Sequence, residues 1–160
     1  MCRTNDNQTK NFEDIIKLNE LNFDYIHLKS QTNGLLPLNM TCVRFDQISL
    51  VGSLFQLTNI DGATFEGSCL NDATFEDSSL VGVVFKGTQL RGTNFGTSNL
   101  QDALFIDVDL TTTKLTKKQL QEANFVNSKL PDGTESKGTT RKILEVTGNN
   151  YTSISSHKKI

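Results

Sequence analysis

The sequence ATFEGSCLNDATFEDSSLVG, residues 63–82, shows an arrangement that recurs every five residues from Leu38 to Asp132. The third residue of every group of five in this stretch is apolar. These central residues are Met40, Phe45, Leu50, Phe55, Ile60, Phe65, Leu70, Phe75, Leu80, Phe85, Leu90, Phe95, Leu100, Phe105, Leu110, Leu115, Leu120, Phe125 and Leu130. Only 36% of the chain is apolar, so an unbroken series of this length reflects the fold rather than the composition.

The residues on either side of each centre indicate how the chain is shaped. Two places before the centre the residue is mostly small or β-branched, as in Ala63 and Ser68, which indicates a second inward position with little room. Two places after the centre comes glycine or aspartate at most positions, as in Gly67 and Asp72. These two residue types accept the backbone angles of a tight turn. Each group of five is therefore predicted to be a short extended piece followed by a corner.

A period of five excludes the two common regular structures. A helix would return its apolar face every three or four residues, and a strand would do so every two. Four extended pieces joined by corners close instead into a square coil of about 20 residues, whose layers stack about 4.8 Å apart, the spacing of hydrogen-bonded strands.

The groups of five at residues 63–67 (ATFEG), 73–77 (ATFED) and 93–97 (TNFGT) resemble those of the pentapeptide-repeat proteins. The resemblance covers residues 38–132 and implies an all-β fold, a right-handed quadrilateral β-helix of about five coils. The ending LPDGT, residues 130–134, is similar to that of cyanobacterial and plastid members of the family. Because the matched positions are packing positions, the resemblance carries over no catalytic or binding residue.

Phenylalanine and leucine alternate along the centres, so a 20-residue coil places them on different walls. One wall would carry Phe45, Phe65, Phe85, Phe105 and Phe125, and the opposite wall would carry Phe55, Phe75 and Phe95. We interpret these phenylalanines as the structural core rather than as an aromatic surface for stacking bases or ligands. Burial of each ring is expected to contribute about 1.5–3 kcal/mol.

The pattern divides the chain into four parts. They are a flexible N-terminus with a capping helix (residues 1–20), degenerate first pentads with a loop (21–37), the repeat β-helix (38–132) and a mostly disordered tail (133–160).

Both ends of the repeat region depart from the five-residue pattern. Asn11 suits the N-cap of a short helix, which we expect to cover the open first coil. Residues 31–37 number seven instead of five, which predicts a register slip of two and a loop, a kind of segment that often carries recognition. At the far end Lys118 falls on an inward position, where an unpaired ammonium is costly. Thr116 and Gln119 match a capping box, so we predict a helical turn from about residue 117 to residue 122.

No residue pattern in the sequence points to catalysis, to a metal or to a cofactor. The two histidines, His27 and His157, stand in no metal-ligand or triad arrangement, and the sequence has no nucleophile elbow or phosphate-binding loop. The outward carboxylates are interpreted as solvated turn residues rather than as an acid pair. We therefore expect a protein that is not an enzyme and that uses no cofactor.

Other features predict the cellular setting. The cysteines, Cys2, Cys42 and Cys69, are far apart and follow no metal-ligand spacing, so we expect reduced thiols. The polar N-terminus has no signal-peptide core, and no apolar run is long enough to span a membrane. These features predict a soluble, cytoplasmic protein.

A non-catalytic protein-interaction or scaffold module is the function that this reasoning favours. The resemblance implies one alternative, a DNA mimic that regulates a DNA-binding enzyme such as gyrase, because the family includes proteins that present an acidic rod in place of DNA. Charge argues against it, since residues 38–132 hold 11 acids and 7 bases, a net charge of −4. That charge is spread over a rod of about 23 Å, whereas DNA carries one charge per about 1.7 Å.

Direct binding of nucleic acid is also unexpected. The tail from residue 133 to residue 160 carries five bases, two acids and a single aromatic residue, Tyr151. This composition supports no more than weak, salt-sensitive contact with a phosphate backbone.

One outward surface is the candidate site for a protein partner or for self-association. On a 20-residue coil four apolar side chains gather on the outside of the wall that contains Phe85. They are Val84, Leu104, Ile106 and Val126. An apolar patch of a few hundred Å² on a protein surface commonly marks an interaction site. The alternative is that the tail, through Ile143, Leu144 and Val146, or the N-terminal segment folds back and covers the patch.

Overall fold

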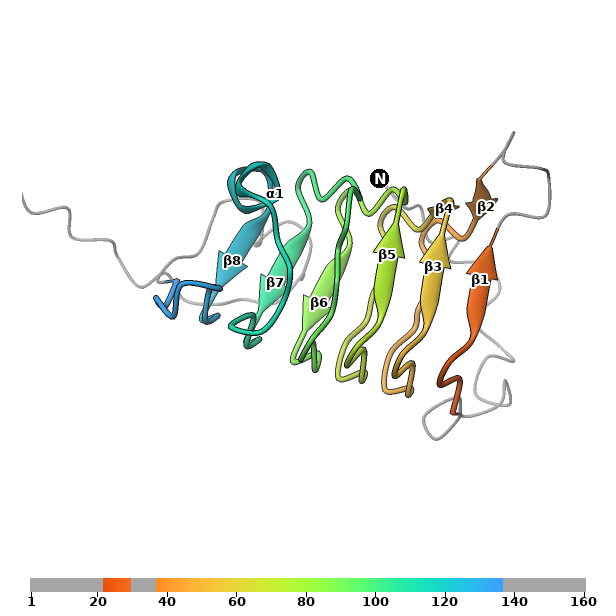
Figure 1. Cartoon of the computed structure of the whole chain (residues 1–160), viewed down its shortest axis with the longest axis horizontal. Coiled ribbons are helices and arrows are strands. Elements are labelled where there is room, and N and C mark those ends of the chain that lie inside the picture. Colours follow the sequence, from red (N-terminus) through yellow and green to blue (C-terminus); the bar gives the residue numbers. More distant parts are fainter. Residues whose placement is uncertain (1–21, 30–36, 137–160) are drawn as a thin grey trace, which may run out of the picture.

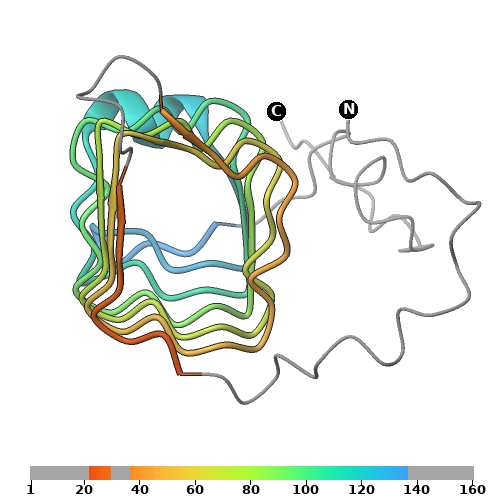
Figure 2. The same cartoon turned by 90° about the vertical axis from the view of Figure 1, so that its right-hand side faces the viewer.

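The computed structural model describes residues 22–29 and 37–136, which wind into one stacked coil (Figure 1). The elements in chain order are β1 (His27–Lys29), β2 (Leu38–Asn39), β3 (Leu54–Gln56), β4 (Thr58–Asn59), β5 (Thr74–Glu76), β6 (Val84–Lys86), β7 (Leu104–Ile106), α1 (Lys117–Glu122) and β8 (Asn124–Val126). Seen end-on, the coil outlines a square with turns at its corners (Figure 2). The predicted all-β quadrilateral β-helix is confirmed.

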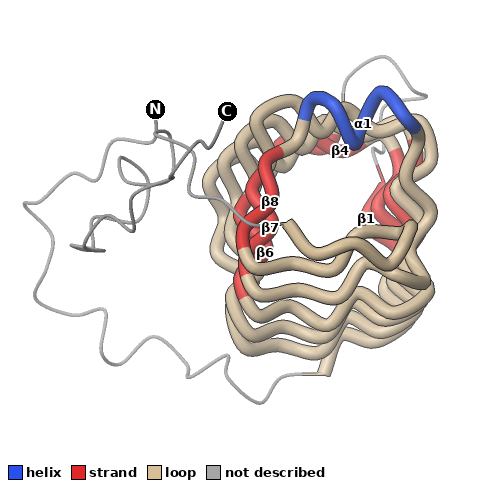
Figure 3. The backbone as a smooth tube through the Cα atoms, turned by 90° about the vertical axis from the view of Figure 1, so that its left-hand side faces the viewer, coloured by secondary structure: helices blue, strands red, loops and turns tan. Residues whose placement is uncertain are grey.

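The named strands pair in parallel with strands one coil away. β6, β7 and β8 form one three-stranded sheet, and β1, β3 and β5 form another on the opposite wall, while β2 pairs with β4 (Figure 3). From β2 onward paired residues lie 20 positions apart, as in Phe85 with Phe105, because five-residue pieces occupy four walls. About four turns are complete, slightly fewer than the predicted five, since the first coil is interrupted and the last contains α1.

The phenylalanine side chains form two facing stacks inside the coil. On one wall the rings of Phe65 and Phe85 lie 5.3 Å apart at 12°, and on the opposite wall those of Phe75 and Phe95 lie 5.4 Å apart at 8°. The two stacks meet edge to face, as in Phe75 and Phe85 at 6.4 Å and 77°. Offset stacking within a wall and edge contacts across the core are both favoured ring geometries. Phe45 and Phe125, at the two ends of their stack, are only partly buried.

The small inward residues place their hydroxyl groups within reach of backbone carbonyls. Ser53 Oγ donates to the Leu50 carbonyl oxygen at 2.6 Å, and Thr93 Oγ1 donates to that of Leu70 at 2.8 Å. Within the described ranges no buried side-chain nitrogen or oxygen lacks a hydrogen-bond partner. A hydroxyl is therefore compatible with this narrow interior because it bonds locally.

The corners need left-handed backbone, which explains their residue types. Gly92 has φ +70°, and a Cβ built there would lie 2.2 Å from Asp72 Oδ1 in the coil below, so a side chain at this position would have to displace the Asp72 carboxylate and hold a strained φ. Leu57 adopts φ +52° without being glycine, asparagine or aspartate. That conformation is unfavourable for a leucine, and the surrounding ladder enforces it.

The first coil contains a longer insertion than the sequence suggests. Leu28 pairs with Phe55, 27 positions later, whereas Leu38 pairs with Thr58, 20 positions later. The difference shows that seven residues are inserted at one corner between adjacent walls. The predicted register slip of two residues is therefore wrong. The shift is seven residues, because the insertion adds no further wall to the coil.

The helical turn at the far end is confirmed over Lys117–Glu122. Thr116 caps it, with its hydroxyl accepting from the Gln119 backbone N–H at 3.2 Å while Gln119 Oε1 accepts from the Thr116 backbone N–H at 2.9 Å. Lys118 does not point inward but lies at the surface, 3.7 Å from Glu122. The helix thus replaces a strand corner where an inward ammonium would have been buried.

The capping helix near Asn11, the strand near residues 142–147 and most of the loop at residues 31–37 lie outside the described residues, so they stay predictions. So does the division of the chain into four parts. Cys69 is a free thiol, but Cys42 is disulfide-bonded, and the expectation of reduced thiols is wrong for this residue. Sequence spacing misses such a bond because it depends on distances in the folded chain.

Candidate functional site

The outward side chains of the β6–β7–β8 wall change character along the rod. In the first two coils the positions flanking the central phenylalanine hold Arg44 and Asp46, then Thr64 and Glu66. From β6 onward four of the six flanking positions are apolar, the other two being Lys86 and Asn124. The apolar residues meet in register, Val84 beside Leu104 and Ile106 beside Val126. The structure therefore brings together the four residues that the coil period predicts as a patch.

These four side chains form a cluster of their own, separate from the core that contains Phe85 and Phe105. We call this set, Val84, Leu104, Ile106 and Val126, the outer cluster. It is not an open surface, because Leu104 is 5% exposed and Ile106 and Val126 are each 8% exposed, while Val84 is partly buried. The sequence could predict that these residues are neighbours but not how far they are covered.

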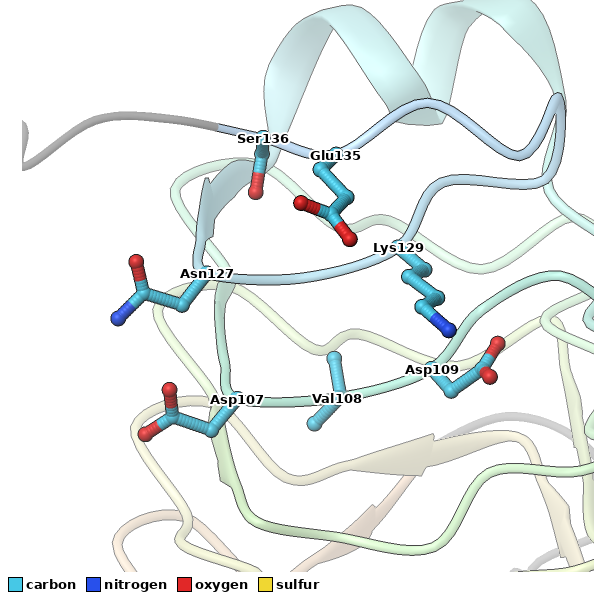
Figure 4. Close-up of a pocket in the computed structure, with 7 residues that line it drawn as sticks. All are labelled: Asp107, Val108, Asp109, Asn127, Lys129, Glu135 and Ser136. Carbon is cyan, nitrogen blue, oxygen red and sulfur yellow. The ribbon is translucent and has the colours of Figure 1, made fainter.

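A shallow polar groove borders the outer cluster at the next corner of the coil. It has a volume of about 550 Å³ and is lined by Asp107, Val108, Asp109, Asn127, Lys129, Glu135 and Ser136. Figure 4 shows these side chains on two adjacent coils and on the chain that follows them. Asp107 directly follows Ile106, and Asn127 directly follows Val126, so the groove and the outer cluster form one continuous surface.

The end of the described chain forms one side of the groove. Residues 134–136 run antiparallel to residues 128–130, with Glu135 opposite Lys129. The Ser136 backbone N–H donates to the Ser128 carbonyl oxygen at 2.8 Å, and Ser136 Oγ accepts from the Ser128 backbone N–H at 3.0 Å. The five-residue period does not predict this groove. The only signal for it is the Pro131-Asp132-Gly133 turn, which reverses the chain.

The carboxylate of Asp109 in this groove is already engaged by its own coil. Its Oδ1 accepts from the Thr111 hydroxyl at 2.6 Å and from the Thr111 backbone N–H at 2.9 Å. The hydrogen bond from the Thr111 hydroxyl lowers the pKa of Asp109, with the backbone N–H and the charge of Lys129 acting in the same direction. An ionised carboxylate held this way is a turn-stabilising group and not a poised general acid.

Other carboxylates on the rod join one coil to the next. Asp46 Oδ1 accepts from the Thr64 hydroxyl at 2.7 Å and from the Glu66 backbone N–H at 2.8 Å. Asp61 repeats the arrangement with Ser79 at 2.6 Å and Val81 at 2.9 Å. Asp24 does the same with Ser49 and Val51 at the first coil. These carboxylates accept hydrogen bonds from backbone N–H groups that the hydrogen bonds between strands leave unpaired.

This use of carboxylates predicts a specific acid sensitivity. Hydrogen bonds, from Ser49 foremost at Asp24 and from Thr111 foremost at Asp109, lower both pKa values below the usual 3.8. A carboxylate whose pKa is lower in the folded state than in the unfolded state stabilises the fold at pH values above its unfolded-state pKa. This stabilisation is lost as the pH falls through its folded-state pKa. We expect the free energy of unfolding to decrease below about pH 5 and to decrease less steeply in Asp24→Asn and Asp109→Asn. Urea unfolding between pH 7 and pH 2.5 measures both slopes.

The control for the acid series is Asp107→Asn, which removes one negative charge at an exposed corner of the same rod. An unchanged pH slope in Asp24→Asn and Asp109→Asn, relative to the parent, would contradict the structural role of these two carboxylates.

The described residues hold no group of three or more histidine, cysteine, aspartate or glutamate side chains that could bind a metal. Within the same ranges no helix is long and apolar enough to cross a membrane. His27 lies on β1, on the wall opposite the outer cluster.

Comparison with known proteins agrees with this architecture. Residues 58–134 match the family model of the pentapeptide repeat region, whereas no curated protein matches the chain. HetL, a pentapeptide repeat protein involved in heterocyst differentiation regulation in the cyanobacterium Nostoc sp. strain PCC 7120, has 17% identity and a TM-score of 0.50. The alignment covers 73% of this chain and 51% of HetL.

A pentapeptide repeat protein from the thylakoid lumen of Arabidopsis thaliana has 22% identity and a TM-score of 0.48, over 58% of this chain and 61% of that protein. This chain thus spans less than two thirds of the length of either neighbour. At these identities the likeness concerns the fold. Because the family model, the five-residue period and the square coil agree, residues 58–134 belong to the pentapeptide-repeat family.

Proposed function

We propose that this protein is a non-catalytic interaction or scaffold module, and that a protein partner binds the outer face of the β6–β7–β8 wall. One observation carries the proposal: apolar residues flank the central phenylalanines on the outside of this wall only from β6 onward. The coil closes without them, since Thr64 and Glu66 hold the same positions one coil earlier. Their apolar character therefore serves a contact outside the coil.

The surface has the composition of a small protein interface. The outer cluster supplies an apolar centre, and the bordering groove supplies a polar rim with Asp107, Asn127 and Lys129. An apolar centre with a polar rim is the usual anatomy of a protein–protein contact. Its charge is mixed rather than basic, which favours protein over nucleic acid as the partner.

A DNA-mimic function is not favoured, because several acids of the rod are already engaged within the coil. Asp24, Asp46, Asp61 and Asp109 accept hydrogen bonds within or between coils, and Glu66 pairs with Lys86 at 2.7 Å. A mimic needs phosphate-like charges that remain available to the partner. Gyrase supercoiling in the presence of a quinolone measures this alternative, and inhibition or protection at micromolar protein would favour it over our proposal.

The proposed binding face is tested by changing Leu104 and Ile106 together to Asp. We expect the double variant to lose partner capture or self-association, because two carboxylates in the apolar centre cannot be desolvated without a large cost. Chemical cross-linking followed by mass spectrometry, with sedimentation velocity for self-association, measures the effect. Leu54→Asp is the matched control, since Leu54 is a partly buried outward aliphatic residue of the three-stranded sheet on the opposite wall. Equal capture by the parent and the Leu104→Asp, Ile106→Asp variant would refute the proposed site.

A further inference from the structure

The side chains of the outer cluster are less exposed than we expect for outward residues of a wall. Leu54 provides an internal comparison: it lies in the middle strand of its sheet, flanked by His27 and Thr74, and remains only partly buried. Leu104 lies in the middle strand of its own sheet, flanked by Val84 and Asn124, and is only 5% exposed. Flanking strands alone therefore do not account for the burial of the outer cluster.

No described element lies over this wall. The described chain is one layer thick on every side, and β6, β7 and β8 form its outermost layer here (Figures 2 and 3). A further segment packed on the outside of this layer would account for an exposure of a few per cent. The described residues supply the surface but not its cover.

The direction of the chain at residue 136 identifies the nearest candidate for the cover. Residues 134–136 run antiparallel to residues 128–130, so at Ser136 the chain is heading back along Ser128 toward Asn127 and Val126. Val126 belongs to the outer cluster. The chain therefore leaves the described structure at the edge of this surface and points toward it.

The sequence that follows Ser136 suits the surface in length and in chemistry. Ile143 lies seven positions after Ser136, enough to span about 23 Å when extended, whereas the three strands of the sheet are spread over only about 10 Å. Residues 143–146 (ILEV) are the apolar group of the tail. Arg141 and Lys142 precede them, and the bordering groove carries three acids, Asp107, Asp109 and Glu135, against one base, Lys129.

We infer that the C-terminal segment docks on the outer cluster of its own chain through Ile143, Leu144 and Val146, with its basic residues beside the acidic groove. This inference rests on the proposed function, because it makes the tail the resident occupant of the partner site. A partner must then displace the tail, and anything that holds the tail away opens the site. The tail acts as a competitive cover and not as part of the coil.

A tryptophan reporter tests the docking in the full-length chain. The protein contains no tryptophan, so Leu144→Trp introduces a single emitting side chain at the predicted contact. We expect blue-shifted emission and several-fold slower acrylamide quenching than in the control Ile154→Trp, which places the same reporter further along the tail. Adding Leu104→Asp and Ile106→Asp to the Leu144→Trp chain is expected to shift the emission to the red and to raise quenching to the control value. Cooperative urea unfolding verifies that each variant retains the solenoid.

Four outcomes would overturn the inference. Equal quenching of the Leu144→Trp and Ile154→Trp chains would show that the tail does not dock, and protection that survives the two aspartates would show that it docks elsewhere. Protection that disappears on dilution would assign the cover to a second copy. In the fourth outcome a Phe12→Trp reporter is instead the protected one, with the Leu144→Trp reporter exposed. If the two aspartates abolish that protection, the cover is the N-terminal segment.

A second pair of variants separates failure of this inference from failure of the proposed function. Ile143→Asp with Leu144→Asp removes the tail contact but leaves the outer cluster intact, and we expect partner capture to increase several-fold. If partner capture depends on Leu104 and Ile106 but not on the tail, the proposed partner site is supported and the docking of the tail is refuted. If the tail docks but no partner is captured even after the tail is released, the docking of the tail is supported and the proposed function is refuted.

Discussion

Phe85→Ala is expected to lower the free energy of unfolding by about 3–5 kcal/mol, the usual cost of emptying a packed aromatic site. Phe85 is fully buried. Its ring stacks between those of Phe65 at 5.3 Å and Phe105 at 4.8 Å. Because each wall is fixed by ladders on both sides, the coil cannot collapse to fill the space, and the loss should lie toward the upper part of this range. Urea or guanidinium unfolding monitored by circular dichroism measures it.

Phe125→Ala is the matched control for this substitution. The ring of Phe125 lies at the end of the same stack, 5.3 Å from Phe105, and is only partly buried. Truncation there removes less apolar area from the folded state, so the loss should be clearly smaller than for Phe85. Near-native stability of Phe85→Ala combined with loss of partner capture would show that the stack binds a partner and does not hold the core.

The sequence predicts the coil because its determinants are local and repeat. A central apolar residue, a small residue two places earlier and a turn residue two places later specify one wall, and the 20-residue neighbour relation follows from repeating them. For this reason the sequence alone predicts the contact between Val84 and Leu104. The helical turn was predictable in the same way, because Thr116 and Gln119 lie within one turn of each other.

Features that depend on contacts between separate segments could not be predicted. A register slip of two and a loop are predicted at residues 31–37, because the number of residues there does not show whether a wall is present. The burial of Leu104 and Ile106 depends on what lies over them, and the period of five contains no information on that. The disulfide at Cys42 likewise depends on folding. The cytoplasmic location stays a prediction.

The carboxylate links between coils are an intermediate case. Each of Asp46 and Asp61 directly follows a central residue, and a threonine or serine lies 18 positions later at Thr64 and Ser79. A search for an aspartate and a hydroxyl at this spacing would have found both links from the sequence. Without it, these acids were predicted to be solvated turn residues, whereas the structure shows that they hold adjacent coils together.

Gln119→Leu is expected to cost about 2–4 kcal/mol, although the substitution keeps the size of the side chain and makes it more apolar. Gln119 is 3% exposed. Its Nε2 donates to the carbonyl oxygens of Ser98 at 2.8 Å and Gly96 at 3.3 Å, and its Oε1 accepts from the Thr116 backbone N–H at 2.9 Å. Leucine would leave these groups unpaired, and each unsatisfied buried group costs about 1–3 kcal/mol. Equilibrium unfolding in urea measures the loss.

Gln121→Leu and Gln119→Glu separate the causes of this loss. Gln121 is an exposed residue of the same helix, so its replacement tests helix propensity alone and should change stability little. Glutamate at position 119 keeps an oxygen for the Thr116 N–H but places a charge against the two carbonyl oxygens, so it should cost at least as much as leucine at neutral pH. If Gln119→Leu were neutral while Gln119→Glu destabilised, the helix cap would be dispensable, and the amide would matter only for avoiding a buried charge. We expect both to destabilise, because the Gln119 amide joins α1 to the coil beneath it.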